Sequence, residues 1–559
     1  MIGEQSGNFE FFGSSSAGSF MQQIRVGVDL KLGIDTRSAG QLTGRKLSYF
    51  QQYVRSFTSH QTGFEYVLPS RKTADTLVKG YWDLVYPVYP FLDCISFEEA
   101  YQALWTGSQT KMNERVLVCT VNVLFALGCL VSETLKPEER EETGEMYFDR
   151  AQSLLEGFFW DSGSIELVSC FLLAGVYLQT AKTPRRCWMV IGHAIRMAQS
   201  LGLHLPETNA DLQFPRRTEV TRRIWHGCIL MDRVLSMTFG RPAMISKWLS
   251  LGTPLPLAID DEFLDSQKQE SSMRPDDRPC MMSFFVAQLQ FYDIINDILL
   301  ELYMTNGKER QRSPDIVAVL QLDDALMNWN RNLPDHLQMS SDFSSREDAF
   351  RRLAIINRVR FLHTRILLFR PILAQFCLSQ CNTNHQMTRW DESLAQRTVV
   401  QCCSLCLSAA HNMIELVYAN LDLVTVTGPL PSWWYCVLYV YTAATVLIAE
   451  RLQPAIGAGV AGYSVAVSWK RSIEILKAYA RIGESAKRCV AALEILSAKV
   501  TWEPGPSESR QEQASNFVPD HATPVLGIPI DDTQPVLDFS SINFDLNDMF
   551  WLNSMPGNL

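Results

Sequence analysis

The sequence predicts an all-α fold, a large multi-helix array flanked by disordered N- and C-terminal tails. Its 559 residues are 47% hydrophobic and 20% charged, so most of the chain can bury a core. Long segments whose apolar residues recur every three or four positions dominate over short alternating ones, and that period is typical of helices rather than strands. Glycine, with 30 residues, rarely interrupts these segments.

Changes in composition and in hydrophobic periodicity divide the chain into four regions. The first, 1–69, is linker-like and holds a Gly/Ser knot, "FFGSSSAGSF". Helical periodicity fills 70–340 apart from a polar, proline-containing stretch at 260–280, and 341–500 reads as the C-terminal helical half of the same array. The last region, 501–559, opens on "EPGPSESRQEQASN", a composition typical of disorder.

The densest pattern begins with a helix in "CWMVIGHAIRMAQSLGLH", residues 187–204. One apolar face of this helix is formed by Ile191, Ala194, Ile195, Ala198 and Leu201. Gly202 falls where a helix C-cap favours a left-handed residue. His193 and His204 are separated by about 16 Å along a helix axis, so we do not expect them to share a metal ion.

A second helix is predicted to open at Pro215 and Thr218 and to end at "FGRP", where glycine allows a turn and proline forbids continuation. Its apolar face consists of Val220, Ile224, Cys228, Met231 and Leu235. Glu219 and Arg223 are favourably oriented i, i+4 partners. His226 and Asp232 lie on different faces of the helix, which argues against a catalytic dyad. We therefore interpret the charged residues of this stretch as structural.

One segment, "WWYCVLYVYTAATVLIA" at 433–449, carries no charge and sits at the short limit for crossing a bilayer. The sequence around it has no basic cluster that would set a topology, and we find no second convincing span. We favour a helix buried on all sides in the protein core and expect no membrane association.

Several function classes are disfavoured. The nucleophile-elbow, zinc-protease, phosphate-loop and dinucleotide motifs are missing, so we expect no catalytic or cofactor-binding residue and no enzyme activity. The Gly-rich "GAGVAG" at 457–462 follows a helix end rather than a strand, which indicates a loop. A net charge of −10 argues against an extended nucleic-acid-binding surface. No secretion signal opens the chain, and 14 cysteines, mostly in apolar segments, suit reduced thiols in a cytosolic or nuclear protein.

Four cysteines suggest an alternative. Cys377 and Cys381, followed by Cys403 and Cys406, have nearly the spacing of a four-cysteine structural zinc site. The second pair, however, lies in "VVQCCSLCLSAAHNMIELV", which reads as an amphipathic helix whose face needs small apolar residues. The linker between the pairs also lacks the tight turns of a zinc knuckle. We favour buried thiols over a zinc site.

The core signature at 187–242 resembles the fungal-specific transcription factor regulatory domain, the helical middle homology region of fungal zinc-cluster regulators. The resemblance rests on "AIRMAQSLGLH" and "RRIWHGCILMDRVLSMTFGRP". We expect structural roles for its principal residues, which are Leu201, Gly202, His204, Arg222, Arg223, Trp225, Asp232, Arg233, Gly240, Arg241 and Pro242. Weaker pieces agree: the Tyr/Pro-rich stretch at 68–105, the Gly/Ser knot, and "FLHTRILLFRPIL" at 361–373, which resembles a Leu-Leu-x-Arg-Pro helix end.

The resemblance implies a nuclear regulator of RNA polymerase II transcription, specific to a pathway or gene cluster, whose helical domain responds to an effector or a partner. It also implies homodimers or heterodimers; DNA and zinc are implied only at the family level. Family members begin with a six-cysteine zinc cluster, whereas here the first cysteine is Cys94. We expect that the gene lost the cluster or that the start codon is placed too late. No cofactor is expected in this chain, and zinc would enter only with an upstream cluster.

The C-terminal stretch "DDTQPVLDFSSINFDLNDMFWLNS" interleaves aspartates with large apolar residues and has no Lys or Arg. We interpret it as an activation-type tail in which Phe539, Phe544, Phe550 and Trp551 bind a coactivator or the transcription machinery. The alternative is a tail that packs back onto the helical domain.

Two further readings of the whole chain remain open. One is a cofactor that does not bind DNA and works through a full-length zinc-cluster regulator. The other is a helical ligand-binding protein or an enzyme.

Overall fold

The computed structural model describes residues 13–32, 68–158, 163–180, 184–206, 208, 215–264, 279–304, 315–339, 348–380, 393–457 and 464–501. Within these ranges the regular elements are helices, and an isolated β-bridge joins Asp422 and Thr427. The all-α prediction is confirmed. The predicted tail at 501–559, beyond its first residue, and most of the predicted linker at 1–69 lie outside the described residues.

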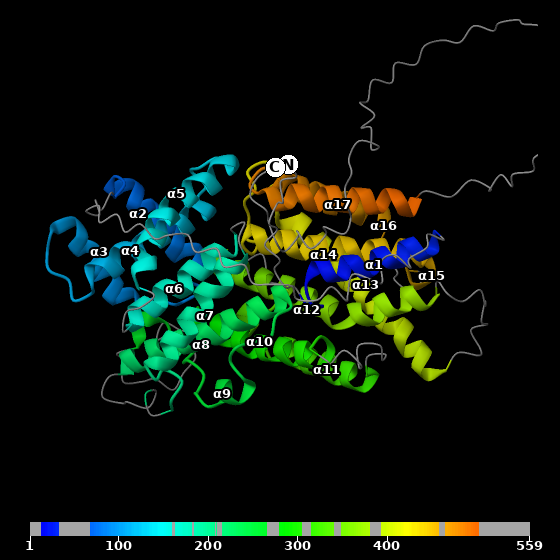
Figure 1. Cartoon of the computed structure of the whole chain (residues 1–559), viewed down its shortest axis with the longest axis horizontal. Coiled ribbons are helices and arrows are strands. Elements are labelled where there is room, and N and C mark those ends of the chain that lie inside the picture. Colours follow the sequence, from blue (N-terminus) through cyan, green and yellow to red (C-terminus); the bar gives the residue numbers. More distant parts are fainter. Residues whose placement is uncertain are drawn as a thin grey trace, which may run out of the picture.

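Helices from the first half of the chain gather at one end of the molecule (Figure 1, left). α4 lies at their centre, buried along nearly its whole length, because its sequence is apolar on every side, and α2, α5 and α6 pack against it. The elements are α2 (Arg71–Gly80), the π-helix η2 (Tyr81–Val85), α3 (Cys94–Thr106), α4 (Glu114–Val131), α5 (Pro137–Leu155), the 3₁₀-helix η3 (Glu156–Phe158), α6 (Ile165–Leu178), α7 (Pro184–Ser200) and α8 (Pro215–Phe239).

The later helices fill the lower middle and the opposite end (Figure 1). They are α9 (Lys247–Leu251), the 3₁₀-helix η5 (Asp261–Phe263), α10 (Met282–Leu302), α11 (Ile316–Arg331), the 3₁₀-helix η6 (Asp335–Leu337), α12 (Asp348–Gln380), α13 (Leu394–Asn420), α14 (Trp433–Leu452), α15 (Pro454–Gly457), α16 (Val465–Tyr479) and α17 (Glu484–Thr501). One continuous apolar cluster runs from Ala17 to Leu496, so the two helical regions predicted from the sequence share a single core.

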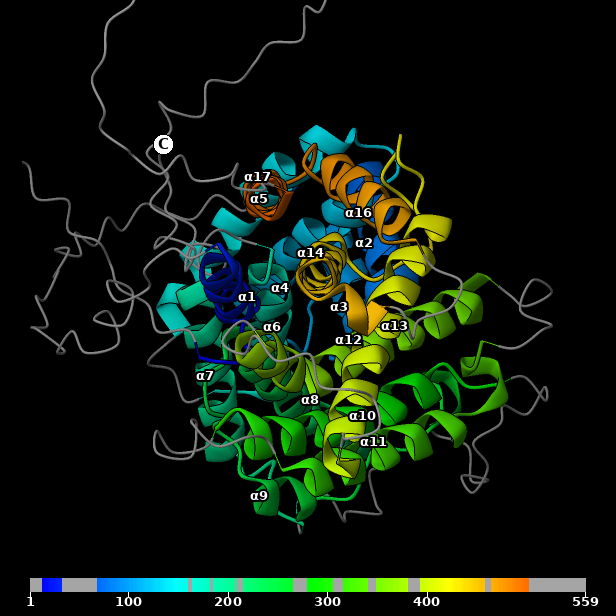
Figure 2. The same cartoon turned by 90° about the vertical axis from the view of Figure 1, so that its right-hand side faces the viewer.

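The uncharged segment at 433–449 lies in α14, which Figure 2 shows nearly end-on, with α1, α12, α13, α16 and α17 packed around it. By length and composition α4, α12, α13 and α14 could each cross a membrane, but 89% of the apolar window of α14 is buried inside the protein. The core-helix prediction is confirmed, because neighbouring helices cover α14 on all sides.

Residues 17–31 correct the linker-like prediction for the N-terminal region. They form α1 (Ala17–Lys31), which packs against α12 and α14 among the C-terminal helices. Phe20, Ile24 and Val28 recur every four positions and are buried, so this short stretch has a helical apolar face. The glycine and serine residues beside it led to the prediction of a linker rather than a helix.

Residues 13–15 of the Gly/Ser stretch, which directly precede α1, connect helices that are distant in sequence. The Gly13 backbone N–H donates to the Phe239 carbonyl at 2.9 Å, at the end of α8. The Ser14 hydroxyl donates to the Tyr303 carbonyl at 3.0 Å, after α10, and the Arg370 guanidinium of α12 donates to the Ser15 carbonyl. The small residues allow this close approach, since a Cβ on Gly13 would lie 1.8 Å from the Gly240 carbonyl oxygen.

α12 departs from the expected helix end at 361–373, because it continues through Pro371 to Gln380. Proline has no N–H to donate to the carbonyl four residues earlier, that of Leu367. The Tyr303 hydroxyl donates to this carbonyl instead, at 2.5 Å. A side chain from another helix therefore replaces the missing hydrogen bond, which lets the helix run on.

We predict that Gly240→Ala destabilises the protein far more than Gly107→Ala. Both glycines have a positive φ, 66° and 68°, so both substitutions carry the same conformational penalty. At Gly107 nothing lies within 4 Å of the added Cβ, whereas at Gly240 it would meet the Gly13 backbone at 2.5 Å. Urea unfolding should show an additional loss of about 1–3 kcal/mol for Gly240→Ala. Equal losses would mean that the Gly13–Gly240 approach is not tight.

Candidate ligand-binding cavity

The first signature helix, α7, has the predicted buried face, with Leu201 only partly buried. Gly202 adopts φ +72°, and the Leu203 N–H donates to the Ala198 carbonyl at 3.0 Å, which closes the predicted left-handed cap. The two histidines go to different places. The His193 ring contacts Phe171, with centroids 4.8 Å apart, whereas His204 lies near the Trp225 indole at 5.8 Å.

The second signature helix, α8, is buried on nearly every side, and its charged residues form a paired network. The Arg223 side chain is only 2% exposed and donates to Glu219 at 3.1 Å, as the i, i+4 spacing predicted. Arg223 also donates to the Asp261 carboxylate and, at 2.8 Å, to the Ile259 carbonyl. Tyr86 donates its hydroxyl to Asp261 as well. The network therefore fixes the loop that leads into η5 against α8.

Burial has opposite consequences for the two charges of the ion pair. It raises the pKa of Glu219, and the neighbouring Arg223 charge only partly opposes this rise. Burial is the largest single influence on Arg223 and would lower its pKa, but Asp261, Tyr86 and Glu219 together outweigh burial and raise that pKa above its ordinary value. Arg222 adds a second hydrogen bond to Glu219 at 3.3 Å. The carboxylates thus keep the buried guanidinium charged.

The rest of the signature shapes the turn after α8. The Asp232 carboxylate accepts from the backbone N–H groups of Met244 and Ile245, at 3.0 and 2.8 Å. Arg233 donates to the Ile245 carbonyl at 2.7 Å. Arg241 follows Gly240 and precedes Pro242, and its guanidinium lies 5.3 Å from the ring centroids of both Trp188 and Phe239.

His226 and Asp232 bind different loops. His226 Nε2 contacts the Pro254 carbonyl at 2.9 Å, whereas Asp232 contacts the loop after α8. The arrangement of the signature supports structural roles, which stay a prediction for each residue.

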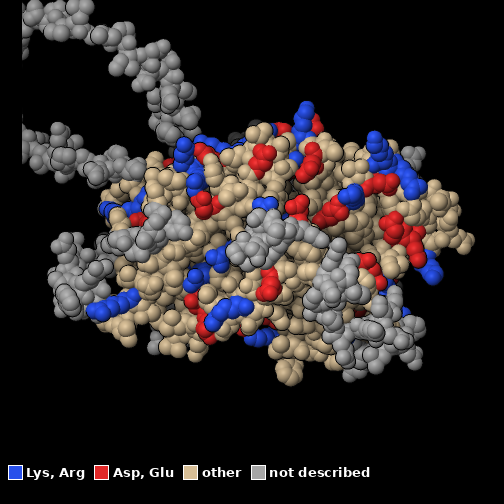
Figure 3. All heavy atoms as spheres, turned by 180° about the vertical axis from the view of Figure 1, so that it is seen from behind, with Lys and Arg blue, Asp and Glu red and all other residues tan. Residues whose placement is uncertain are grey.

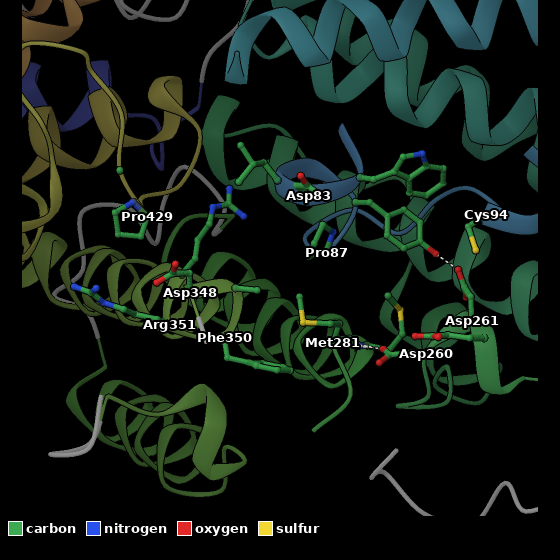
Figure 4. Close-up of a pocket in the computed structure, with 18 of the residues that line it drawn as sticks. Asp83, Pro87, Cys94, Asp260, Asp261, Met281, Asp348, Phe350, Arg351 and Pro429 are labelled. Carbon is green, nitrogen blue, oxygen red and sulfur yellow. Dashed lines mark hydrogen bonds between the residues drawn. The ribbon is translucent and has the colours of Figure 1, made fainter. Parts of the chain in front are cut away.

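A cavity of about 950 Å³ lies next to this network. Its walls come from η2 and the turn after it, from the first residues of α3, α10 and α12, from η5, and from the loop before α14. Figure 4 shows Cys94, Asp260 and Asp261 at one end and Asp348, Arg351 and Pro429 at the other, with Met281 between them. Segments more than 300 residues apart in sequence therefore share one hollow.

The cavity has a polar character that differs between its ends. At the acidic end Asp261 is paired with Arg223 and Tyr86, and Asp260 accepts from the Met282 N–H at 3.2 Å. Arginines from the start of α12, Arg351 and Arg352, line the other end. Aromatic and aliphatic side chains lie between, namely those of Trp82, Leu84, Pro87, Met281, Met282 and Phe350. The cavity can hold an elongated, largely apolar molecule with polar groups at its ends.

The sequence did not single out any of the arginines at this cavity. Their spacing on α12 is that of ordinary helix-surface residues, and nothing local shows that they face a hollow.

The structure also brings together a serine, a histidine and a glutamate that the sequence did not indicate. His411 of α13 contacts the Ser468 hydroxyl of α16 at 2.8 Å and the Glu450 carboxylate of α14 at 3.0 Å. All three side chains are buried where these helices pack. The trio therefore serves to satisfy polar groups inside the core around α14.

Three of the four cysteines of the zinc alternative lie in the core. Cys377, Cys403 and Cys406 are buried, and Cys381 lies outside the described residues. Burial raises the pKa of Cys403 to about 12 and that of Cys406 well above its ordinary value, which disfavours the thiolate that zinc requires. Among the residues with assigned positions, no group of three or more His, Cys, Asp or Glu side chains is arranged for a metal ion.

On the face shown in Figure 3, basic and acidic side chains are interspersed. This mixed pattern differs from the continuous basic band with which proteins follow a nucleic-acid backbone. The face agrees with the acidic net charge of −10.

The described fold thus combines an all-α core, a turn built by buried charges and a large cavity. Residues 78–331 match the family model of the fungal specific transcription factor domain. The resemblance predicted from the signature is therefore confirmed for this part of the chain.

Curated relatives that match much of the chain are fungal regulators. The chain is 28% identical to sorbicillinoid biosynthetic cluster transcription factor 2 of Penicillium rubens, over 87% of this chain and 67% of the relative. It is 27% identical to sorbicillinoid biosynthetic cluster transcription factor sor3 of Hypocrea jecorina, over 77% and 60%, and 26% identical to transcription factor FBD3 of Fusarium pseudograminearum, over 69% and 51%. The chain thus spans about half to two thirds of the length of these curated relatives.

We predict that Trp225→Ala lowers the free energy of unfolding by an amount typical of a core residue, on the order of 3 kcal/mol. The indole is fully buried between α8 and the end of α7, so its removal leaves a cavity. Thermal and urea unfolding measure the loss. A variant with unchanged stability that lacks only a binding activity would show that Trp225 belongs to a binding site.

We predict a pH dependence of stability from two buried histidines. Burial lowers the pKa of His226 to about 4 and that of His363 to about 3. Below about pH 6.5 the unfolded chain takes up protons at these sites, while the folded chain keeps both rings neutral until pH falls to their lowered values. Stability should therefore fall as pH decreases from 6.5 towards 4, by up to about 1.4 kcal/mol per pH unit for each histidine.

Urea unfolding at pH 7 and pH 5 tests this, with His226→Gln as the comparison, because glutamine can still donate to the Pro254 carbonyl. In the variant, the free energy of unfolding should depend less steeply on pH, because the contribution of one histidine is removed. The same pH dependence in variant and wild type would show that His226 does not contribute.

Proposed function

We propose that the protein is a nuclear regulator of RNA polymerase II transcription, specific to one pathway or gene cluster, whose helical domain responds to a small effector. The family domain supports the regulatory role. Two relatives carry names that tie them to a biosynthetic gene cluster, which supports the narrower specificity.

The observation that carries the proposal is the position of the cavity. Four of its wall segments, at 82–95, 133, 260–262 and 281–282, belong to the matched domain at 78–331, whereas 348–352 and 428–429 lie beyond it. A ligand there contacts both parts of the molecule at once. Binding can therefore favour one arrangement of the later helices over another, provided that its affinity differs between them.

α12 offers a direct route for this coupling. It starts at the cavity and runs to the C-terminal helices, where it packs against α1, α13 and α14. A shift at its first turn is transmitted along a rigid element to the region that precedes the C-terminal tail.

The output of the domain would be the tail, which lies outside the described residues. Its aspartates keep Phe539, Phe544, Phe550 and Trp551 solvated, and the aromatic rings supply the apolar contacts for a coactivator. Contacts with DNA and dimer formation are proposed for this protein only at the level of the family.

We predict that residues 501–559, fused to a heterologous DNA-binding domain, activate a reporter gene. Replacing Phe544, Phe550 and Trp551 together with alanine should abolish this activation, because rings that fill a partner's groove carry most of its binding energy. Replacing the aspartates of the tail with asparagine should weaken activity less, since charge mainly steers the encounter.

The same triple substitution in the full chain provides the control. Its helical domain should keep the wild-type melting temperature. A lowered melting temperature combined with normal reporter output would contradict the proposal and would support a tail that packs onto the domain.

A further inference from the structure

The inner end of the cavity carries a positive charge without a counter-charge. Arg352 lines both the cavity and a small adjoining space of about 10 Å³, which has room for about one water molecule. Within the described part of the chain no carboxylate pairs with this guanidinium. Burial and the neighbouring Arg360 lower the pKa of Arg352 to about 10, so the side chain stays charged at neutral pH.

A second arginine lies two turns further along the same face of α12. Arg360 is 3% exposed and donates to the Gln288 side-chain oxygen at 2.5 Å, which is a neutral partner. The Gln288 amide in turn donates to Asn357 at 2.6 Å, so this chain of hydrogen bonds has no anion. The Arg360 guanidinium also lies near the rings of Phe284 and Tyr292, at 5.9 and 5.8 Å.

Another buried arginine of this core has carboxylate partners. Arg223, equally buried, has Glu219 and Asp261 as partners. Arg352 is partly exposed at the cavity wall, whereas Arg360 is buried and lines only the small adjoining space. Because a poorly solvated charge without a partner is unfavourable, these two neighbouring guanidinium groups are a feature that a ligand anion at Arg352 would relieve.

We infer that the cavity binds an organic acid with a single negative charge, whose carboxylate pairs with Arg352 and whose apolar body fills the middle of the cavity. This inference rests on the proposed effector role of the same cavity. A planar carboxylate matches the fork of N–H groups that a guanidinium presents.

The charges around the rest of the cavity restrict the ligand to one negative charge. Six carboxylates line it, those of Asp83, Glu133, Asp260, Asp261, Glu262 and Asp348. They repel a phosphate dianion or a dicarboxylate. Asp260 and Asp261, which lie at the end opposite Arg351 (Figure 4), can accept hydrogen bonds from hydroxyl or amine groups at the far end of the ligand. Trp82, Met281 and Phe350 provide contacts for an aromatic or aliphatic body.

The experiment compares two probes of nearly the same shape, 2-naphthoate and its neutral carboxamide, by isothermal titration with the 559-residue chain. The acid should bind at one site per chain and at least about tenfold more tightly than the amide, since a hydrogen bond to an ion is stronger than one between neutral groups. Inorganic phosphate at equal concentration should not displace the acid.

Variants on α12 locate the site. Arg352→Gln should abolish the preference for the acid over the amide, and Arg352→Lys should retain part of it. Arg358→Gln is the matched control, because Arg358 lies on the same helix against Phe361 and does not line the cavity. Its affinity for the acid should equal that of the wild type.

Stability measurements separate a binding role from a structural one. Arg352→Gln should melt at the wild-type temperature or above it, because it removes an unmatched charge, and 2-naphthoate should raise the melting temperature of the wild type only. If Arg352→Gln fails to fold, Ala349→Trp replaces it. Ala349 is exposed at the mouth of the cavity, so tryptophan should block the acid without disturbing the core.

Three outcomes would overturn the inference: equal binding of acid and amide by the wild type, no binding of the acid at millimolar concentration, or an unchanged preference in Arg352→Gln. None of these would affect the reporter assay of residues 501–559. Conversely, failure of that assay would refute the proposed activation tail and leave the acid-binding result intact.

Discussion

The structure depends on how the buried charged side chains of α8 are paired within the core. A helix buried on nearly every side would ordinarily be apolar, yet this one contains Glu219, Arg223, Asp232 and Arg233. Glu219 is paired within the helix by Arg222 and Arg223. The segments that follow the helix supply the Asp261 carboxylate and backbone groups that bind the four charged residues. Because a buried charge without a partner is strongly unfavourable, those segments have few alternative positions. The loop into η5 and the turn after Gly240 are placed in this way.

The same constraint positions the cavity. Asp261, held by Arg223 and Tyr86, forms one wall, and the turn at Gly240 receives the Gly/Ser knot that leads into α1. α1 in turn packs with α12 and α14 in the later helices. The signature at 187–242 therefore supplies none of the residues that line this cavity. It fixes the positions of the segments through which the family domain and the later helices pack around the cavity.

Paired and unpaired arginines have different meanings in this protein. Where Arg223 meets two carboxylates, the charge holds two segments together. Arg370 instead donates to the Ser15 carbonyl and the Tyr303 hydroxyl, and it joins three distant segments without an ion pair. Among the residues that the structure describes, Arg352 has neither kind of partner and it lines a cavity, which is the arrangement expected of a residue whose partner arrives from outside. Arginines with protein partners thus stabilise the fold, whereas Arg352 is available to a ligand.

Local pattern was sufficient for much of the fold. The faces of α7 and α8, the cap at Gly202, the Glu219–Arg223 pair and the burial of α14 all follow from spacing within one helix, which the chain determines by itself. Only tertiary structure decided the rest. α1 is a core helix because distant helices cover its short apolar face, and α12 passes Pro371 because Tyr303 supplies the missing donor. Arg352 differs from any other helical arginine only through what surrounds it, and the surroundings come from segments distant in sequence, at 82–89, 281–282 and 428–435.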